Sequence, residues 1–140
     1  MSVVVGFTPS PQGRAALAAA LRESTSRPRP LIVISHAHVD LRRGRVVADE
    51  AEVRAELREL RRETHPDEEE HGPHELDLRV LVSHDEDVAE VLLDAIEESK
   101  ADLLVIGLRR KSPNGKLNLG ASARRLVLSA PCAVLAVKDR

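Results

Sequence analysis

Hydrophobic positions fall into five short runs along the chain, separated by stretches with helical spacing. Four of the runs are continuously apolar, which is typical of parallel strands buried on both faces of a sheet. They are VVVGF (3–7), LIVIS (31–35), LLVIG (103–107) and AVLAV (133–137). The fifth run, LDLRVLV (76–82), begins with alternating polar and apolar residues, and this alternation predicts a strand nearer the sheet edge.

The stretches between the runs predict four amphipathic helices. The first begins after Ser10, a favourable N-cap residue, with Pro11 at the first helical position. The second occupies about 47–63, the third follows the capping pattern Asp87-x-x-Glu90, and the fourth ends at Pro131. Their expected apolar faces are, in chain order, Gly13, Leu17, Ala20 and Leu21; Val46, Val53, Leu57 and Leu60; Val88, Val91, Leu92 and Ala95; and Ala123, Leu126, Val127 and Ala130.

The alternation of strands and helices predicts an α/β fold, a doubly wound parallel sheet with helices on both faces. The chain has 140 residues, of which 42% are hydrophobic, and this is enough apolar material for one core. Residues 1–140 are therefore expected to form a single domain. The charged segment THPDEEEHGPHE (64–75) has no periodicity, which predicts a solvated surface loop.

Charge is unevenly distributed along the chain. The net charge is −2, but residues 1–102 contain 13 Lys and Arg against 22 Asp and Glu. From Leu103 to Lys138 there is no acidic residue, and seven basic residues occur there: Arg109, Arg110, Lys111, Lys116, Arg124, Arg125 and Lys138. This basic stretch begins where LLVIG ends and leads into the fourth helix.

The sequence GLRRKSPNGKLNLGASARRL (107–126) therefore has the features of an anion site, most simply one for phosphate. Ligands of open α/β sheets bind beyond the carboxyl ends of the strands. Gly107, Gly115 and Gly120 permit close backbone approach and positive φ, and a helix that starts near Gly120 directs its free N–H groups at the loop. The alternative is a loop before a helix whose charges are only solvated.

Several other ligand classes are disfavoured. A Walker loop is absent because Leu117 follows Gly115-Lys116, and the first strand is followed by GFTPSPQG rather than a dinucleotide fingerprint. With no Trp, no Tyr and one Phe, the chain has no platform for stacking unpaired bases, so nucleic acid is an unlikely partner. The N-terminus does not resemble a signal peptide and no apolar run approaches the roughly 20 residues that span a bilayer, so we expect a cytoplasmic protein without membrane contact.

Other reactive side chains have a plain structural alternative. His36, His38 and Asp40 would share one face if their strand continued and could then bind a metal, but solvated or nucleotide-facing histidines are favoured. His65, His71 and His74 lie in the charged loop. The single cysteine, Cys132, is expected to be a small buried hydrophobe. Ser112 and Ser122 lack an identifiable base, and Arg124 and Arg125 are either surface charges or ligand contacts.

Over essentially its whole length the chain resembles the universal stress protein family. ATP-binding members carry Gly, two residues, Gly, nine residues, Gly and then Ser or Thr between the fourth strand and the fourth helix; Gly107 and Gly120 match the first and last of these glycines. The ending APCAVLAVK is similar to the family's final strand, and GLRRKSPNGKLNLG resembles a variant loop common in actinobacterial members.

The resemblance implies a five-stranded sheet of order 3-2-1-4-5 and an adenine-nucleotide site. The nucleotide-binding positions that it implies are Gly6, Phe7, Thr8, His36, Ala37, Gly107, Arg109, Arg110, Gly120, Ala121 and Ser122. Three positions depart from the family pattern: Arg110 replaces the second glycine, Ala121 the hydroxyl residue, and Thr8 an aspartate that contacts the nucleoside. Arg110 could strengthen phosphate attraction, and Ser122 could supply the missing hydroxyl.

The expected function is that of a non-catalytic, ATP-binding stress sensor or regulator, without a bound metal. The resemblance also implies a homodimer in which the two C-terminal strands pair antiparallel, and a protein partner of unknown identity. The alternative is a homodimeric interaction module of the same fold that has lost nucleotide binding. An enzyme is less favoured, because the serine- and glycine-rich loop of related ATP-pyrophosphatases is missing after the first strand.

Overall fold

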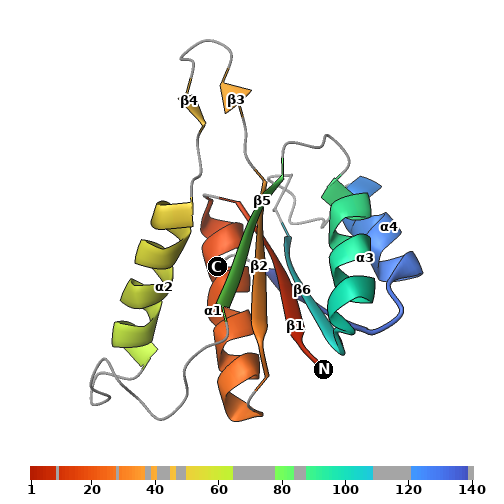
Figure 1. Cartoon of the computed structure of the whole chain (residues 1–140), viewed down its shortest axis with the longest axis horizontal. Coiled ribbons are helices and arrows are strands. Elements are labelled where there is room, and N and C mark those ends of the chain that lie inside the picture. Colours follow the sequence, from red (N-terminus) through yellow and green to blue (C-terminus); the bar gives the residue numbers. More distant parts are fainter. Residues whose placement is uncertain are drawn as a thin grey trace, which may run out of the picture.

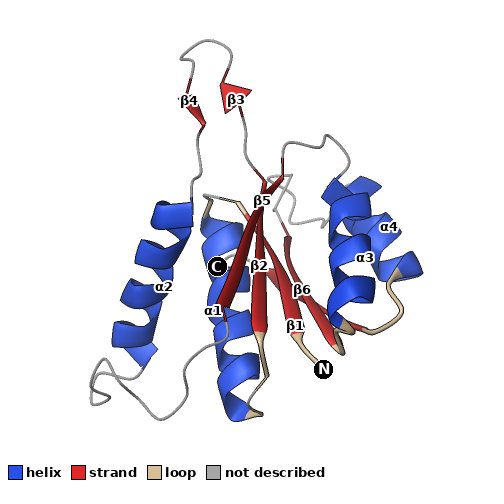
Figure 2. Ribbon diagram, viewed as in Figure 1, coloured by secondary structure: helices blue, strands red, loops and turns tan. Residues whose placement is uncertain are grey.

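The computed structural model describes residues 1–8, 10–27, 29–36, 39–40, 45–46, 50–64, 78–83, 88–108 and 121–138. In this part of the chain a central parallel sheet is covered by two helices on each face (Figure 1 and Figure 2). The predicted α/β class with a parallel sheet and helices on both faces is thereby confirmed. Of the charged loop at 64–75, only Thr64 lies within the described residues.

The strands of the central sheet are β1 (Val3–Phe7), β2 (Leu31–His36), β5 (Leu78–Ser83), β6 (Leu103–Leu108) and β7 (Ala133–Lys138). Their order is β5-β2-β1-β6-β7, and every neighbouring pair is parallel. The central strand β1 pairs with β2 from Val3↔Leu31 to Phe7↔Ser35 and with β6 from Val3↔Leu103 to Val5↔Val105. Strand β5 lies at the edge, in agreement with its alternating sequence.

A second, two-stranded antiparallel sheet projects beyond the carboxyl end of the central one (Figure 1). It consists of β3 (Val39–Asp40) and β4 (Arg45–Val46), and it was not predicted. Val46 pairs with Val39 there, so its assignment to the second helix was wrong. Because the chain is still extended at Val46, that helix begins only at Glu50.

One face of the sheet is covered by α1 (Pro11–Ser26) and α2 (Glu50–Thr64). The side chain of Ser10 accepts a hydrogen bond from the Gly13 amide at 3.1 Å, which confirms the predicted N-cap. The predicted faces of both helices are buried against β1, β2 and β6: Gly13, Leu17, Ala20 and Leu21 from α1, and Val53, Leu57 and Leu60 from α2.

The other face is covered by α3 (Val88–Ser99) and α4 (Ala121–Ser129). Leu92, Ala95, Ile96 and Leu126 pack there against Val4, Ile32, Ile34, Leu104 and Ile106. Asp87, the expected cap of α3, lies outside the described residues. Each helix pair thus forms its own hydrophobic core with one face of the sheet.

Two predictions of burial at the C-terminal edge were wrong. Val127 was assigned to the buried face of α4 but is 46% exposed, and its neighbour Leu128 is 76% exposed. Strand β7 was expected to be buried on both faces, yet Ala133, Ala136 and Lys138 are exposed and the other residues are half-buried. The reason is positional: β7 has a neighbour, β6, on one side only, so this edge lacks the cover that internal strands receive.

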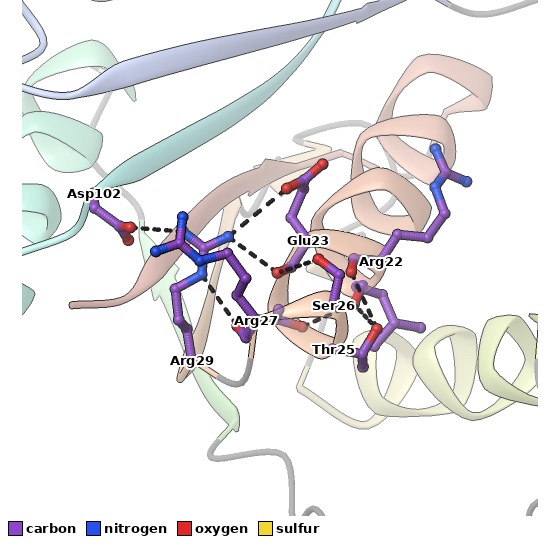
Figure 3. Close-up of polar contacts among 9 residues, drawn as sticks. Arg22, Glu23, Thr25, Ser26, Arg27, Arg29 and Asp102 are labelled. Carbon is purple, nitrogen blue, oxygen red and sulfur yellow. Dashed lines mark hydrogen bonds and ion pairs between the residues drawn. The ribbon is translucent and has the colours of Figure 1, made fainter.

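At the amino-terminal ends of the strands, the side chain of Arg29 links α1 to the residue before β6 (Figure 3). Its guanidinium donates to Asp102 Oδ2 at 2.7 Å and to the main-chain oxygens of Glu23 at 3.0 Å and Arg27 at 3.3 Å. The Arg29 side chain is only 11% exposed, so these contacts replace most of its hydration. They join the end of α1 to the start of β6.

We expect Asp102→Asn to lower the free energy of unfolding by about 1.5–3 kcal/mol, the range for a hydrogen bond to a charged group. The amide preserves the size of the side chain but leaves the largely buried guanidinium without its carboxylate partner. Urea unfolding followed by circular dichroism measures the loss. The exposed Asp94 of α3 provides the control Asp94→Asn, and equal losses in the two variants would show that the ion pair contributes no stability.

Candidate functional site

The candidate site lies where β1 and β6 run side by side at the centre of the sheet. The connection from β1 through α1 to β2 passes over one face, and the connection from β6 through α4 to β7 passes over the other. The chain therefore leaves these adjacent strands in opposite directions, which opens a crevice at their carboxyl ends. Gly6 and Phe7 of β1, Thr8 directly after it, and Gly107 of β6 lie at these carboxyl ends.

Gly107 allows β6 to approach the first turn of α1. A Cβ atom at this position would lie 2.4 Å from the backbone oxygen of Gln12, which is too close for any side chain. Gly107 itself lies in the extended ladder, paired with Val137, and does not have a positive φ. The first glycine of the loop motif is thus required by packing between strand and helix.

The end of β1 forms a small hydroxyl network. Thr8 Oγ1 lies 2.8 Å from Ser10 Oγ, and the Thr8 carbonyl accepts from the Ser10 amide at 2.8 Å. Ser10 Oγ also accepts from the Gly13 amide at 3.1 Å, and either hydroxyl can donate in the Thr8–Ser10 contact, so the exposed Thr8 hydroxyl retains further hydrogen-bonding capacity. The preceding Gly6 is packed near Leu92 of α3, whose Cδ1 would lie 3.3 Å from an added Cβ.

The remaining predicted nucleotide positions divide into described and undescribed residues. Ala121 and Ser122 are exposed in the first turn of α4, so the helix begins directly after the last glycine of the motif. His36 is the last residue of β2 and pairs with Ser83. Ala37, Arg109, Arg110 and Gly120 lie outside the described residues, as do Gly115, Lys111, Lys116 and Ser112.

A cavity of about 580 Å³ lies beside the carboxyl end of β1 and is lined by α1 and α2. It was not predicted from the sequence. Its described lining consists of Phe7, Ser10, Pro11, Arg14, Ala55, Glu56 and Glu59. Arg14 Nε forms an ion pair with Glu56 Oε1 across the cavity wall, between α1 and α2. The spacing of charged residues along each helix carried no signal that α1 and α2 would face one another.

The predicted metal site required the strand that contains His36 to continue as far as Asp40, and it does not. Strand β2 ends at His36 and Asp40 belongs to β3, in a different sheet, so His36 and Asp40 do not alternate along one strand. His38, His65, His71 and His74 lie outside the described residues. Within the described ranges, no group of three or more His, Cys, Asp or Glu side chains is placed to hold a metal ion.

The structure shows the surroundings of two side chains that the sequence singled out, Arg125 and Cys132. Arg125 Nη2 lies 2.5 Å from Glu90 Oε2, so this arginine links α4 to α3. Cys132 packs against the α3/α4 core, and burial, together with the negative charge of Asp102, raises the pKa of its thiol above the usual value. A raised thiol pKa disfavours the nucleophilic thiolate, which fits the expected unreactive side chain, but Cys132 is half-buried rather than buried.

This arrangement defines the class: a doubly wound α/β protein whose chain leaves its two central strands, β1 and β6, toward opposite faces of the sheet. The sequence profile of the Universal stress protein family matches residues 1–138. A universal stress protein of Mycolicibacterium smegmatis is 38% identical over 97% of this chain and 96% of its own length. The chain belongs to the universal stress protein family.

Solved structures agree with this fold. The universal stress protein from Archaeoglobus fulgidus in complex with dAMP superposes with a TM-score of 0.61 at 22% identity, covering 99% of this chain and 98% of its own. A universal stress protein in complex with cAMP gives a TM-score of 0.62 at 23% identity, covering 100% and 98%. In the described part of this chain, no helix is both long and apolar enough to cross a membrane.

Proposed function

We propose that this protein binds an adenine nucleotide, most simply ATP, at the carboxyl ends of β1 and β6. The observation that carries the proposal is the position of α4, which begins at Ala121, the residue after the last motif glycine. A helix N-terminus at this edge presents backbone N–H donors to phosphate, and backbone donors survive the exchange of side chains. The dAMP and cAMP complexes of structurally similar family members support the same ligand class.

In this proposal the ligand contacts are those of the family positions. Thr8 would offer its hydroxyl to the ribose, the residue that packs by the adenine would be His36 or Ala37, and Arg109 and Arg110 would contact the phosphates. Thr8 and Ala121 lack the carboxylate and hydroxyl of the family pattern, a loss of two hydrogen bonds of about 0.5–1.5 kcal/mol each. We therefore expect an affinity roughly ten- to a hundredfold below that of members with the full pattern, unless Arg110 compensates.

The protein then acts as a sensor or regulator in the cytoplasm, whose affinity for a protein partner changes with bound nucleotide. Ser122 is exposed at the start of α4, and the sequence identifies no base for it. We expect ATP turnover slower than about one per second, below ordinary enzymes. Faster steady turnover by purified protein, abolished with Arg110→Ala, would assign a catalytic role instead.

A homodimeric interaction module without nucleotide is the second candidate, and the exposed C-terminal edge favours it. Among the described strands, β7 is the last of the central sheet and pairs on one side only, and Val127 and Leu128 of α4 are exposed. An uncovered apolar edge of this kind favours pairing with another strand. We propose that two copies pair their β7 strands antiparallel in either functional state.

Nucleotide binding is tested with Arg110→Ala. We expect this variant to weaken ATP binding by about tenfold or more, since it removes a charge-assisted contact, and to leave adenosine binding unchanged. Calorimetry measures both ligands, and chromatography of denatured protein detects any nucleotide carried through purification. The control is Arg22→Ala at an exposed position of α1.

The two candidate functions make different predictions in this experiment. The absence of both binding heat and a thermal shift with millimolar ATP would reject nucleotide binding and favour the interaction module. Equal losses of affinity for ATP and adenosine in Arg110→Ala would show that Arg110 does not contact the phosphates, while the proposal of nucleotide binding would stand.

A further inference from the structure

Helix α2 carries its charges in two stripes of opposite sign. Glutamates follow one side of the helix, and arginines, spaced so that they share another side, follow the second. The acidic stripe consists of Glu56, Glu59 and Glu63, and the basic stripe consists of Arg54, Arg58, Arg61 and Arg62. Arg54, Arg58 and Arg62 are exposed, so the basic stripe lies on the surface of the protein.

The packing of α2 determines the direction in which the basic stripe points. Val53, Leu57 and Leu60 are buried against the sheet, and Glu56 of the acidic stripe pairs with Arg14 of α1. Around the helix axis, the arginines are displaced from the buried face in the direction opposite to Glu56. The basic stripe therefore lies on the side of α2 that faces away from α1.

On this side of α2 the central sheet ends with β5. Helix α1 lies mainly over β1 and β6, whereas α2 contacts β5. Among the described strands β5 pairs only with β2, from Leu78↔Leu31 to Ser83↔His36. In a parallel ladder the backbone N–H and C=O groups of alternate residues point away from the neighbouring strand, so β5 has an edge at which another strand can pair. In Figure 1 β5 lies in front of the other strands, with α2 to one side of it.

The strand edge and the basic stripe together select an acidic peptide. A strand edge is matched by the regularly spaced N–H and C=O groups of another peptide backbone, which a nucleic acid does not have. The arginines favour negative charge, and guanidinium groups form bidentate contacts with carboxylates. A broad polyanion would also meet the acidic stripe of the same helix and the excess of acidic residues in residues 1–102. A narrow, extended, acidic peptide fits both features.

We propose that the β5 edge and the basic stripe of α2 together bind an extended acidic segment of a partner protein. The segment adds as a further strand beside β5, and every second side chain of an added strand points to the face that α2 covers. Carboxylates at those positions contact the exposed Arg58 and Arg62. This site lies at the edge opposite β7, so it requires neither a bound nucleotide nor the dimer.

A set of matched peptides tests the proposal. The peptide ETEVETE has carboxylates at alternate positions, and QTQVQTQ replaces them with neutral amides of the same size. A third peptide keeps the side chains of ETEVETE but is N-methylated at every peptide bond, so its backbone cannot donate to a strand. We expect ETEVETE to bind at least about tenfold more tightly than either control, because each control lacks one of the two kinds of contact. Titrations are followed by NMR of isotope-labelled protein, in which the amide signals of β5 should shift.

Substitutions on α2 assign the charge effect to the basic stripe. We expect Arg58→Gln and Arg62→Gln each to weaken the binding of ETEVETE about two- to fivefold, the range for an exposed charge pair, and to leave the binding of QTQVQTQ unchanged. Both side chains are exposed, so the fold should tolerate the substitutions. The control Arg22→Gln removes an exposed arginine of α1 and should change neither affinity.

Several results would overturn the acidic-peptide site. Equal binding of QTQVQTQ would show that charge is not recognised, and equal binding of the N-methylated peptide would show that the strand edge is not used. Equal effects of the α2 variants and Arg22→Gln would mean that only the net charge of the protein matters. Amide shifts confined to β7 would place the peptide at the other edge. Tighter binding of a short oligothymidylate at the β5 amides would assign the surface to nucleic acid, and no binding of ETEVETE at millimolar concentration would reject the site.

Discussion

Gly13→Ala is expected to destabilise the protein by about 3 kcal/mol or more, although alanine is the better helix former. Gly13 lies buried in the first turn of α1, and an added Cβ would be 1.9 Å from the backbone oxygen of Thr8 and 2.9 Å from its nitrogen. Neither atom belongs to a flexible side chain, so the β1–α1 connection would have to move. Overpacking of a tight site costs typically 1–3 kcal/mol, and backbone contacts this short place the cost at the upper end or above.

The sign of this effect separates packing from helix propensity. In an unconstrained helix, glycine to alanine stabilises by about 0.5–1 kcal/mol. The control Ala15→Gly, at a partly exposed position of the same helix, should therefore lose about that amount. Because the chain has no Trp or Tyr, unfolding by urea is best followed by circular dichroism. A stabilised Gly13→Ala protein would show that α1 does not approach Thr8 this closely.

The second large effect concerns association. We expect the wild-type protein to be a dimer at micromolar concentration and Ala136→Glu to raise the dimer dissociation constant by about a hundredfold or more. Ala136 is exposed near the middle of β7, so a full-length antiparallel pairing of two copies would bring both glutamates close together. Like charges facing each other across an interface cost several kcal/mol.

The choice of Ala136 over its neighbour follows from the packing. Val137 is partly buried against the α1/α2 core, so a glutamate there would destabilise the fold as well as the dimer. Ala136→Gln is the control of equal size without the charge, and sedimentation velocity measures all three proteins. A wild-type protein that sediments as a monomer at micromolar concentration would reject the dimer, and equal dissociation of both variants would attribute the effect to side-chain size.

Individual elements show how far the sequence pattern reaches. Ser10 and Pro11 placed the start of α1 correctly, because capping is a local interaction between residues two or three positions apart. Val46 was misplaced because its spacing from Val53 fits the apolar face of a helix, and this spacing does not reveal that Val46 lies in a hairpin before the helix begins. Val127 was misplaced because periodicity identifies an apolar face but not whether another element covers it.

The sequence by itself determined the alternation of strands and helices, the α/β class, and the family to which the chain is similar. These follow from local patterns: continuous apolar runs, helical spacing, caps and the interval from Gly107 to Gly120. Only the tertiary structure decided that Gly107 and Gly13 are required by backbone approach at α1, that Arg14 meets Glu56 across a cavity, and that Arg29 reaches Asp102. Such contacts join residues up to 95 positions apart in the sequence, as Gln12 and Gly107 show. They depend on how the helices pack against the sheet, which no local pattern specifies.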